Sequence, residues 1–162
     1  MIVVSNTSPL TNLAAIGQFD LLHKLYGEIH MPLGVWDELN AGGKRWPGRD
    51  EVARSDWVKH HTVQNRALVT ALLRDLESGE AESIALCLEL AADLLLMDEK
   101  EGRRAAERHG LNVIGVVGVL IEAKANGFVN HVRPYLDALR RIAGFRLRES
   151  LYSYVLTIVH ED

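Results

Sequence analysis

The chain has 162 residues, of which 48% are hydrophobic and 25% charged, proportions that favour one globular domain and exclude a mainly disordered chain. The formal net charge of −4 excludes a general electrostatic attraction to nucleic acid, so any such contact requires a local basic patch. No apolar run reaches the roughly 18 residues that span a bilayer, and no signal peptide is recognisable, which predicts a cytoplasmic protein without a membrane partner.

Short apolar segments have the length and composition of buried strands, and helical periodicity fills the intervals between them. Strands are expected at Ile2–Ser5, Glu28–Met31, Asp93–Met97 and Asn112–Gly115, with a more polar fifth at Trp57–Val63. Strands that alternate with helices predict a mostly parallel sheet covered by helices on both faces. We therefore expect a single α/β domain over residues 1–162.

The helices are expected between and after these strands. In chain order they run to Ile16 from a cap at Thr7 or Ser8, then over Asp20–Tyr26, Gly34–Asn40, Arg66–Glu77, Glu80–Ala91, Lys100–His109, Val117–Ala125, Val132–Ile142 and Leu147–His160. Gly79 is expected to interrupt the helical pattern, and Ala41–Arg54, with three glycines and a proline, to form a loop. Cys87, the single cysteine, reads as a small buried apolar side chain.

Polar side chains follow two strands at the edge where sites form in open parallel sheets. Asn6 follows the first strand and Asp98 the third, so the two are expected side by side if these strands are neighbours. Glu80 and Glu82 begin the helix before the third strand, and Glu38 lies on an earlier helix. Converging carboxylates repel each other unless a cation neutralises them, and hard oxygen ligands suit Mg²⁺ or Mn²⁺. This set therefore indicates a metal site able to activate water against a phosphodiester.

Each of these residues also has a purely structural interpretation. Glu80 and Glu82 can complement the helix dipole, an effect of about 0.3–1 kcal/mol. Asp98 can cap the next helix, Glu38 can be a solvated helix residue, and Asn6 can bond to local backbone. The metal-site hypothesis therefore depends on the joint order of the residues.

Four segments in that order resemble a PIN-like family related to VapC-type toxins. They are MIVVSNTSPLTNLAAIGQFDLL, MPLGVWDEL, SGEAESIALCLELAADLLLMDEKEGRRAA and NVIGVVGVLIEAKANG. The similarity extends from Ile2 to about Val155 and includes the closing segment GFRLRESLY. The resemblance implies a three-layer α/β/α fold with a sheet of four to five strands, and a Mg²⁺- or Mn²⁺-dependent ribonuclease site.

Carried over by position, the resemblance implies that Glu38, Glu82 and Asp98 are the catalytic acids. Glu80 is the alternative to Glu82, and the register of the motif leaves the choice open, with Glu82 favoured. The usual first aspartate is replaced by Asn6, which offers a neutral carbonyl oxygen as a metal ligand and removes one negative charge. This replacement is expected to weaken metal affinity.

Further side chains are implied around these acids. Ser8 matches the hydroxyl residue that supports the first acid, and Glu99 and Glu101 are potential helpers. Arg103 and Arg104 follow within two turns and can contact RNA phosphate bidentately, although they can equally form a solvated helix face. A second basic segment with an aromatic residue, suited either to single-stranded RNA or to a plain surface turn, comprises Lys44, Arg45, Trp46 and Arg49.

Two functions of different classes remain open. The first is a metal-dependent endoribonuclease, free-standing or acting as the toxin of a type II toxin–antitoxin pair with an antitoxin that covers the acidic pocket. The second is an RNA- or protein-binding module whose nuclease activity is attenuated or lost because of Asn6. The apolar C-terminal segment Phe145–Val159 and the resemblance to VapC-type toxins favour a homodimer.

Overall fold

The computed structural model describes residues 1–162 and contains one five-stranded sheet. The strands are β1 (Val3–Ser5), β2 (Ile29–Pro32), β3 (Val58–His61), β4 (Leu94–Leu96) and β5 (Val113–Ile114). Their order is β3-β2-β1-β4-β5, and every neighbouring pair is parallel. The expected α/β architecture and strand positions are therefore confirmed, including the weaker fifth strand.

Ten α-helices and one short 3₁₀ segment connect the strands. They are α1 (Thr7–Ala15), α2 (Leu21–Tyr26), α3 (Leu33–Leu39), η1 (Ala41–Gly43), α4 (Arg49–Arg54), α5 (Arg66–Leu72), α6 (Ser78–Leu90), α7 (Lys100–Arg108), α8 (Val116–Ala125), α9 (Arg133–Arg141) and α10 (Glu149–Ile158). No helix is both long and apolar enough to cross a membrane.

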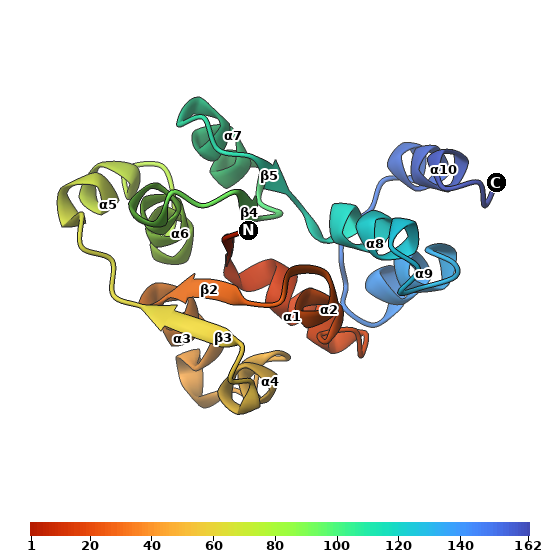
Figure 1. The fold of residues 1–162 in the computed structure, drawn as a ribbon, viewed down its shortest axis with the longest axis horizontal. Coiled ribbons are helices and arrows are strands. Elements are labelled where there is room, and N and C mark those ends of the chain that lie inside the picture. Colours follow the sequence, from red (N-terminus) through yellow and green to blue (C-terminus); the bar gives the residue numbers. More distant parts are fainter.

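The sheet separates two hydrophobic clusters because successive side chains of a strand point to opposite faces. Val3 and Leu96 belong to a cluster of 26 buried residues that includes α1, α2 and α8 and continues into α9 and α10. Val4 and Leu95 belong to a cluster of 13 buried residues formed with α5, α6 and α7. Helices therefore cover both faces, which gives three layers (Figure 1).

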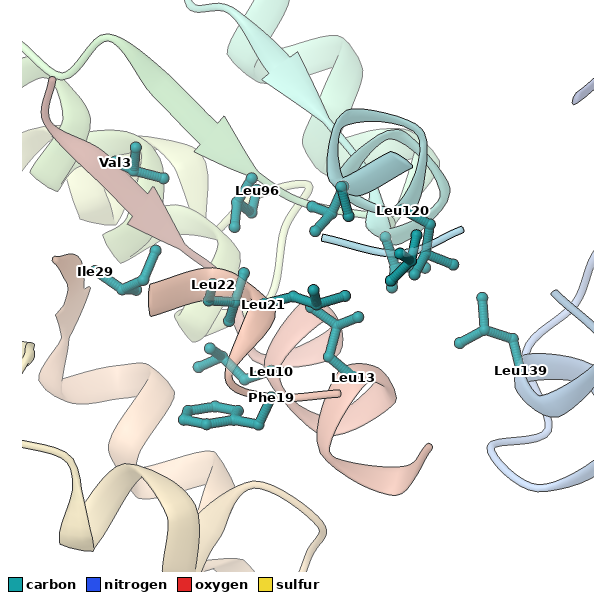
Figure 2. Packing of buried hydrophobic residues seen from close by; sticks show 14 of the residues in the cluster. Val3, Leu10, Leu13, Phe19, Leu21, Leu22, Ile29, Leu96, Leu120 and Leu139 are labelled. Carbon is teal, nitrogen blue, oxygen red and sulfur yellow. The ribbon is translucent and has the colours of Figure 1, made fainter. Parts of the chain in front are cut away.

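The larger cluster carries most of the packing. Figure 2 shows side chains of β1, β2 and β4 facing leucines of α1, α2 and α8. Burial of a leucine, isoleucine or phenylalanine contributes about 1.5–3 kcal/mol, so this face anchors the strands whose ends carry the polar side chains. Cys87 lies in the smaller cluster, 1% exposed, and burial raises the pKa of its thiol to about 12, as expected for an inert core residue.

Three local predictions were wrong. The expected loop Ala41–Arg54 contains η1 and α4, because α4 buries Val52 against the main core. Gly79 does not interrupt a helix but lies inside α6, which begins one residue earlier. The cause is a capping box in which the side chains of Glu77 and Glu80 each accept the other residue's backbone N–H. The preceding helix, α5, ends earlier than expected, at Leu72.

Candidate functional site

A polar pocket opens between the carboxyl ends of β1 and β4, where the order of the strands across the sheet changes direction. β2 and β3 lie on one side of β1, and β4 and β5 on the other, so the carboxyl ends of β1 and β4 form the crevice that binds ligands in open α/β sheets. The backbone N–H of Asn6 donates to the carbonyl of Leu96 at 2.9 Å and holds these two ends together. The pocket has a volume of about 230 Å³ and is lined by Asn6, Thr7, Ser8, Glu38, Glu77, Glu80 and Glu99. Its lining contains no basic and no hydrophobic residue.

Asn6 meets Glu99 rather than Asp98. The Asn6 Nδ2 donates to Glu99 Oε2 at 3.0 Å, and the Ser8 hydroxyl donates to Glu99 Oε1. Asn6 itself is 2% exposed, and its Oδ1 is buried without a hydrogen-bond partner. Ser8 therefore bonds to an acid that follows β4, whereas the resemblance implies that it supports the residue at the position of the first acid. The N-cap residue of α1 is Asn6, and its side chain makes no capping hydrogen bond. The prediction of a cap at Thr7 or Ser8 was therefore wrong.

Glu38 reaches the pocket from α3 and is held from two other elements. Its Oε2 accepts the Thr7 hydroxyl hydrogen bond, and its Oε1 accepts the backbone N–H of Gly79 at 2.9 Å. A Cβ at position 79 would overlap Glu38 Oε1, so glycine is required for this approach. Thr7 and Gly79 hold Glu38 in the candidate site, and neither was assigned to it from the sequence.

Glu80 enters the pocket from the first turn of α6. Its Oε1 accepts the backbone N–H of Glu77 at 3.0 Å. Burial raises the pKa of Glu80, the Glu77 hydrogen bond opposes this, and the carboxylates of Glu99, Glu77 and Glu38 raise it further. The acids of the pocket therefore repel one another, which is the electrostatic condition that a bound cation relieves.

Glu82 lies outside the pocket, which corrects its expected placement. Its Oε1 accepts the backbone N–H of Gly34 at 2.9 Å, and its Oε2 pairs with Arg66 at 3.2 Å. Two residues along an α-helix are separated by about 200° around its axis, so Glu80 and Glu82 face opposite sides of α6. Glu82 joins α6 to α3 and α5, and Glu80 alone of the two faces the other acids.

Asp98 is displaced from Asn6 and lies in the adjoining cavity, which corrects the expected side-by-side arrangement. Its Oδ1 accepts the backbone N–H of Val116 at 3.0 Å, while its Oδ2 is buried without a partner. The pKa of Asp98 is raised to about 6, chiefly by burial. The charge of Glu99 adds to this rise, whereas the Val116 hydrogen bond and the charge of Arg103 oppose it. The adjoining cavity, of about 340 Å³, shares Ser8 and Glu99 with the pocket.

The pocket and the adjoining cavity offer oxygen ligands of the kind that hard divalent cations prefer, but these ligands are not gathered around one point. Across the chain, the only buried side-chain nitrogen or oxygen atoms without a partner are Asn6 Oδ1 and Asp98 Oδ2, at the ends of neighbouring strands. No three acidic, histidine or cysteine side chains are close enough together to hold one ion in this arrangement. Protein hydrogen bonds occupy the carboxylates of Glu38 and Glu99, so an ion would have to replace some of them.

The remaining predicted residues lie outside the pocket. Glu101 is exposed on α7 and pairs with Arg104 at 3.5 Å. Arg103 and Arg104 line a larger neighbouring groove that also includes Asp98. In the basic segment after α3, Lys44 stacks over Trp46, with its Nζ 4.5 Å from the ring centroid.

Comparison with known proteins agrees with the fold. A model of the family DUF3368, a PIN domain, matches residues 2–161. No curated protein and no solved structure matches the chain. PIN domains are nuclease-like modules that generally use divalent metal ions. Because the family model covers nearly the whole chain and the fold is a three-layer α/β/α domain, the chain belongs to the PIN domain family DUF3368.

Proposed function

We propose that the protein is a metal-dependent endoribonuclease whose ion, Mg²⁺ or Mn²⁺, is held by Asn6, Glu38, Glu80 and Glu99. The proposal rests on one observation above all: the acidic pocket at the β1–β4 crevice includes a buried Asn6 Oδ1 that has no partner. An amide oxygen and carboxylates are the ligands that these hard cations prefer. Family membership supports both the metal and the RNA substrate.

The protein's own groups have separable tasks in this proposal. A divalent ion bound there would polarise a phosphodiester and lower the pKa of an attacking water. Thr7 and Ser8 orient Glu38 and Glu99 through their hydroxyl hydrogen bonds. Asp98 adds a free carboxylate oxygen from the adjoining cavity.

Phosphate contacts are proposed for the arginines of α7. The side chains of Arg103 and Asp98 both lie against Gly115, where an added Cβ would contact Arg103 Nη1 and Asp98 Oδ1. Arg103 is therefore close to Asp98. Arg103 and Arg104 both line the groove next to the acids, where their guanidinium groups can bind a phosphate of the scissile strand.

Metal binding to matched variants tests this site. We expect calorimetry to show Mn²⁺ binding at millimolar or lower concentration for the natural protein, and no binding for Glu80→Gln. Glu82→Gln is the control, because it makes the same change two residues away on α6 but outside the pocket. Cleavage of single-stranded RNA should require the metal and should be lost only in Glu80→Gln. Equal Mn²⁺ affinity in all three proteins would refute the proposed ligand set.

A second candidate function is an RNA- or protein-binding module with attenuated nuclease activity. It is favoured by the Asn6–Glu99 hydrogen bond, because Asn6 satisfies Glu99 without any metal. The two functions differ in the response to Asn6→Asp. If the natural protein binds RNA without cutting it and Asn6→Asp restores cleavage, the natural site is attenuated. If the natural protein already cleaves RNA in Mn²⁺, the binding-module function is excluded.

We further propose that the cell uses the protein as the toxin of a toxin–antitoxin pair, with an antitoxin that covers the acidic pocket. This proposal is supported by the resemblance of the four segments to VapC-type toxins. A homodimer is supported by the apolar C-terminal helix α10, on which Ile158, outside the groove lined by Arg103 and Arg104, is 43% exposed. Growth arrest on expression, abolished by Glu80→Gln, tests the toxin role. The molar mass from light scattering after size-exclusion chromatography tests the dimer.

A further inference from the structure

A groove rich in cationic side chains lies beside the acidic pocket, between α7 and α10. Its volume is about 790 Å³. Three basic residues come from α7 and two from the segment between α9 and α10: Lys100, Arg103, Arg104, Arg146 and Arg148. In a chain with a formal net charge of −4, this is the kind of local basic patch that the composition requires for a nucleic-acid contact.

Most of these cations are free to bind a ligand. Arg104 pairs with Glu101, whereas the other four basic side chains of the groove form no ion pair. The acids in the lining are Asp98, which already accepts the Val116 N–H, and Glu107. With five basic and two acidic side chains in its lining, the groove carries an excess of positive charge.

Two aromatic side chains accompany the cations. Tyr154 of α10 is 62% exposed, and Phe145, at the start of the arginine-containing segment, is half-buried. Unpaired bases stack on such side chains regardless of their sequence, while neighbouring arginines hold the phosphates. An acidic peptide would use the same cations but would gain less from an exposed aromatic face.

The groove is continuous with the acidic pocket. The cavity of about 340 Å³ shares Asp98, Phe145 and Arg146 with the groove, and it shares Ser8 and Glu99 with the acidic pocket. A strand bound between α7 and α10 is thereby led to the carboxyl ends of β1 and β4. In Figure 1, α7 and α10 lie on the same side of the molecule, with β5 and α8 between them.

We propose that this groove binds a single-stranded polynucleotide, with its phosphates on Arg103, Arg146 and Arg148 and a base stacked on Tyr154, and leads it into the acidic pocket. The inference rests on the proposed nuclease function for what happens at the end of that path. Binding along the groove is independent of it, because none of these four residues lines the acidic pocket.

Fluorescence anisotropy with a short labelled single-stranded RNA, in EDTA to prevent cleavage, tests the groove. We expect Tyr154→Ala to weaken binding by about 5- to 150-fold, the effect of losing one stacked base. Arg146→Ala and Arg148→Ala should each weaken binding and reduce the slope of log affinity against log salt by about 0.7, the value for one phosphate contact. Arg108→Ala is the matched control, because Arg108 is an exposed α7 residue outside the groove. It should leave both affinity and slope unchanged.

The proposal is overturned if the groove variants bind like the natural protein, or if Arg108→Ala weakens binding as much as they do. It is also overturned if a poly-glutamate peptide binds more tightly than RNA and is lost in the same variants, which would assign the groove to a protein partner. Tighter binding of an RNA duplex would overturn the single-stranded assignment. A parallel titration with single-stranded DNA shows whether the groove distinguishes ribose from deoxyribose. If the same variants also lose DNA binding, that result supports the groove.

The failure of this inference and the failure of the nuclease proposal are distinguishable. Glu80→Gln should retain full RNA affinity in EDTA, because Glu80 lies outside the groove. RNA binding that depends on Arg146 and Tyr154, with no cleavage in Mn²⁺, would keep the groove and remove the nuclease. Cleavage that is unchanged when Arg146 or Tyr154 is substituted would support the nuclease proposal and overturn the groove. Thermal unfolding of each variant shows whether it remains folded.

Discussion

The substitution Asn6→Asp perturbs the centre of the pocket in a way that can be worked out from the contacts. It replaces the Nδ2 that donates to Glu99 Oε2 at 3.0 Å with a second carboxylate oxygen. A hydrogen bond to a charged group contributes about 1.5–3 kcal/mol. Two carboxylates at that separation would repel by about 5 kcal/mol at an effective dielectric constant of about 20. Side-chain rotation or protonation relieves part of this repulsion, so we expect a net loss of at least about 2 kcal/mol in EDTA.

Metal should reverse that loss. In a protein of this size, about 2 kcal/mol corresponds to a fall in Tm of about 4–8 °C. A ligand that binds only the folded state at 100 times its Kd stabilises it by about 2.7 kcal/mol. The variant is therefore expected to melt below the natural protein in EDTA and at or above it in saturating Mn²⁺, because its added charge binds the cation more tightly.

Thermal unfolding in EDTA and across a Mn²⁺ titration measures both effects without any activity assay. Asn130→Asp is the control, because it adds the same charge at an exposed position outside the pocket. It should change neither Tm nor the Mn²⁺ response. The reasoning is refuted if Asn6→Asp melts with the natural protein in EDTA and both respond equally to Mn²⁺.

Three further outcomes are expected. Glu82→Gln should lower stability by about 1 kcal/mol in denaturant unfolding, because it breaks the pair with the exposed Arg66; a loss of Mn²⁺ binding would contradict its structural role. Gly79→Ala should lower Mn²⁺ affinity in calorimetry by about 10- to 100-fold, because its Cβ displaces Glu38; unchanged affinity would exclude Glu38 as a ligand. For the side chain of Glu161, burial would raise the pKa, but hydrogen bonds from two backbone N–H groups and a lysine lower it from 4.5 to about 2. A depressed carboxyl pKa stabilises the fold above the unfolded value, so this stability should be lost as pH falls from 4.5 towards 2. Glu161→Gln should lose most of that stability at neutral pH, and a constant difference from the natural protein down to pH 2 would contradict the assignment.

Much of the fold was predictable because its signals are local. The five strands, their alternation with helices and the burial of Cys87 follow from apolar runs and helical periodicity, which depend on neighbours within a few residues. The position of α4 was not predictable in this way, because its sequence is rich in turn residues. Only the burial of Val52 in the main core makes that segment helical.

The candidate site was likewise predictable only where its signals are local. The order of the acids along the chain pointed to the carboxyl ends of β1 and β4, since parallel strands bring these ends to one edge. Glu80 and Glu82 were predicted to belong to one set of converging acids, although the 3.6-residue period of a helix puts them on opposite sides of α6. Which of the two faces inward depends on Gly34 and Arg66, residues of other elements that bind Glu82.

What the sequence by itself determined is the set of elements, their parallel arrangement and the polar residues that follow the first and third expected strands. Only the tertiary structure decided that Glu99 rather than Asp98 meets Asn6, because Val116 at the start of α8 binds Asp98. It also decided that Arg146 and Arg148 join the arginines of α7 in one groove. The physical reason is that spacing along a chain sets which side chains share an element. Packing between distant elements sets which of them meet.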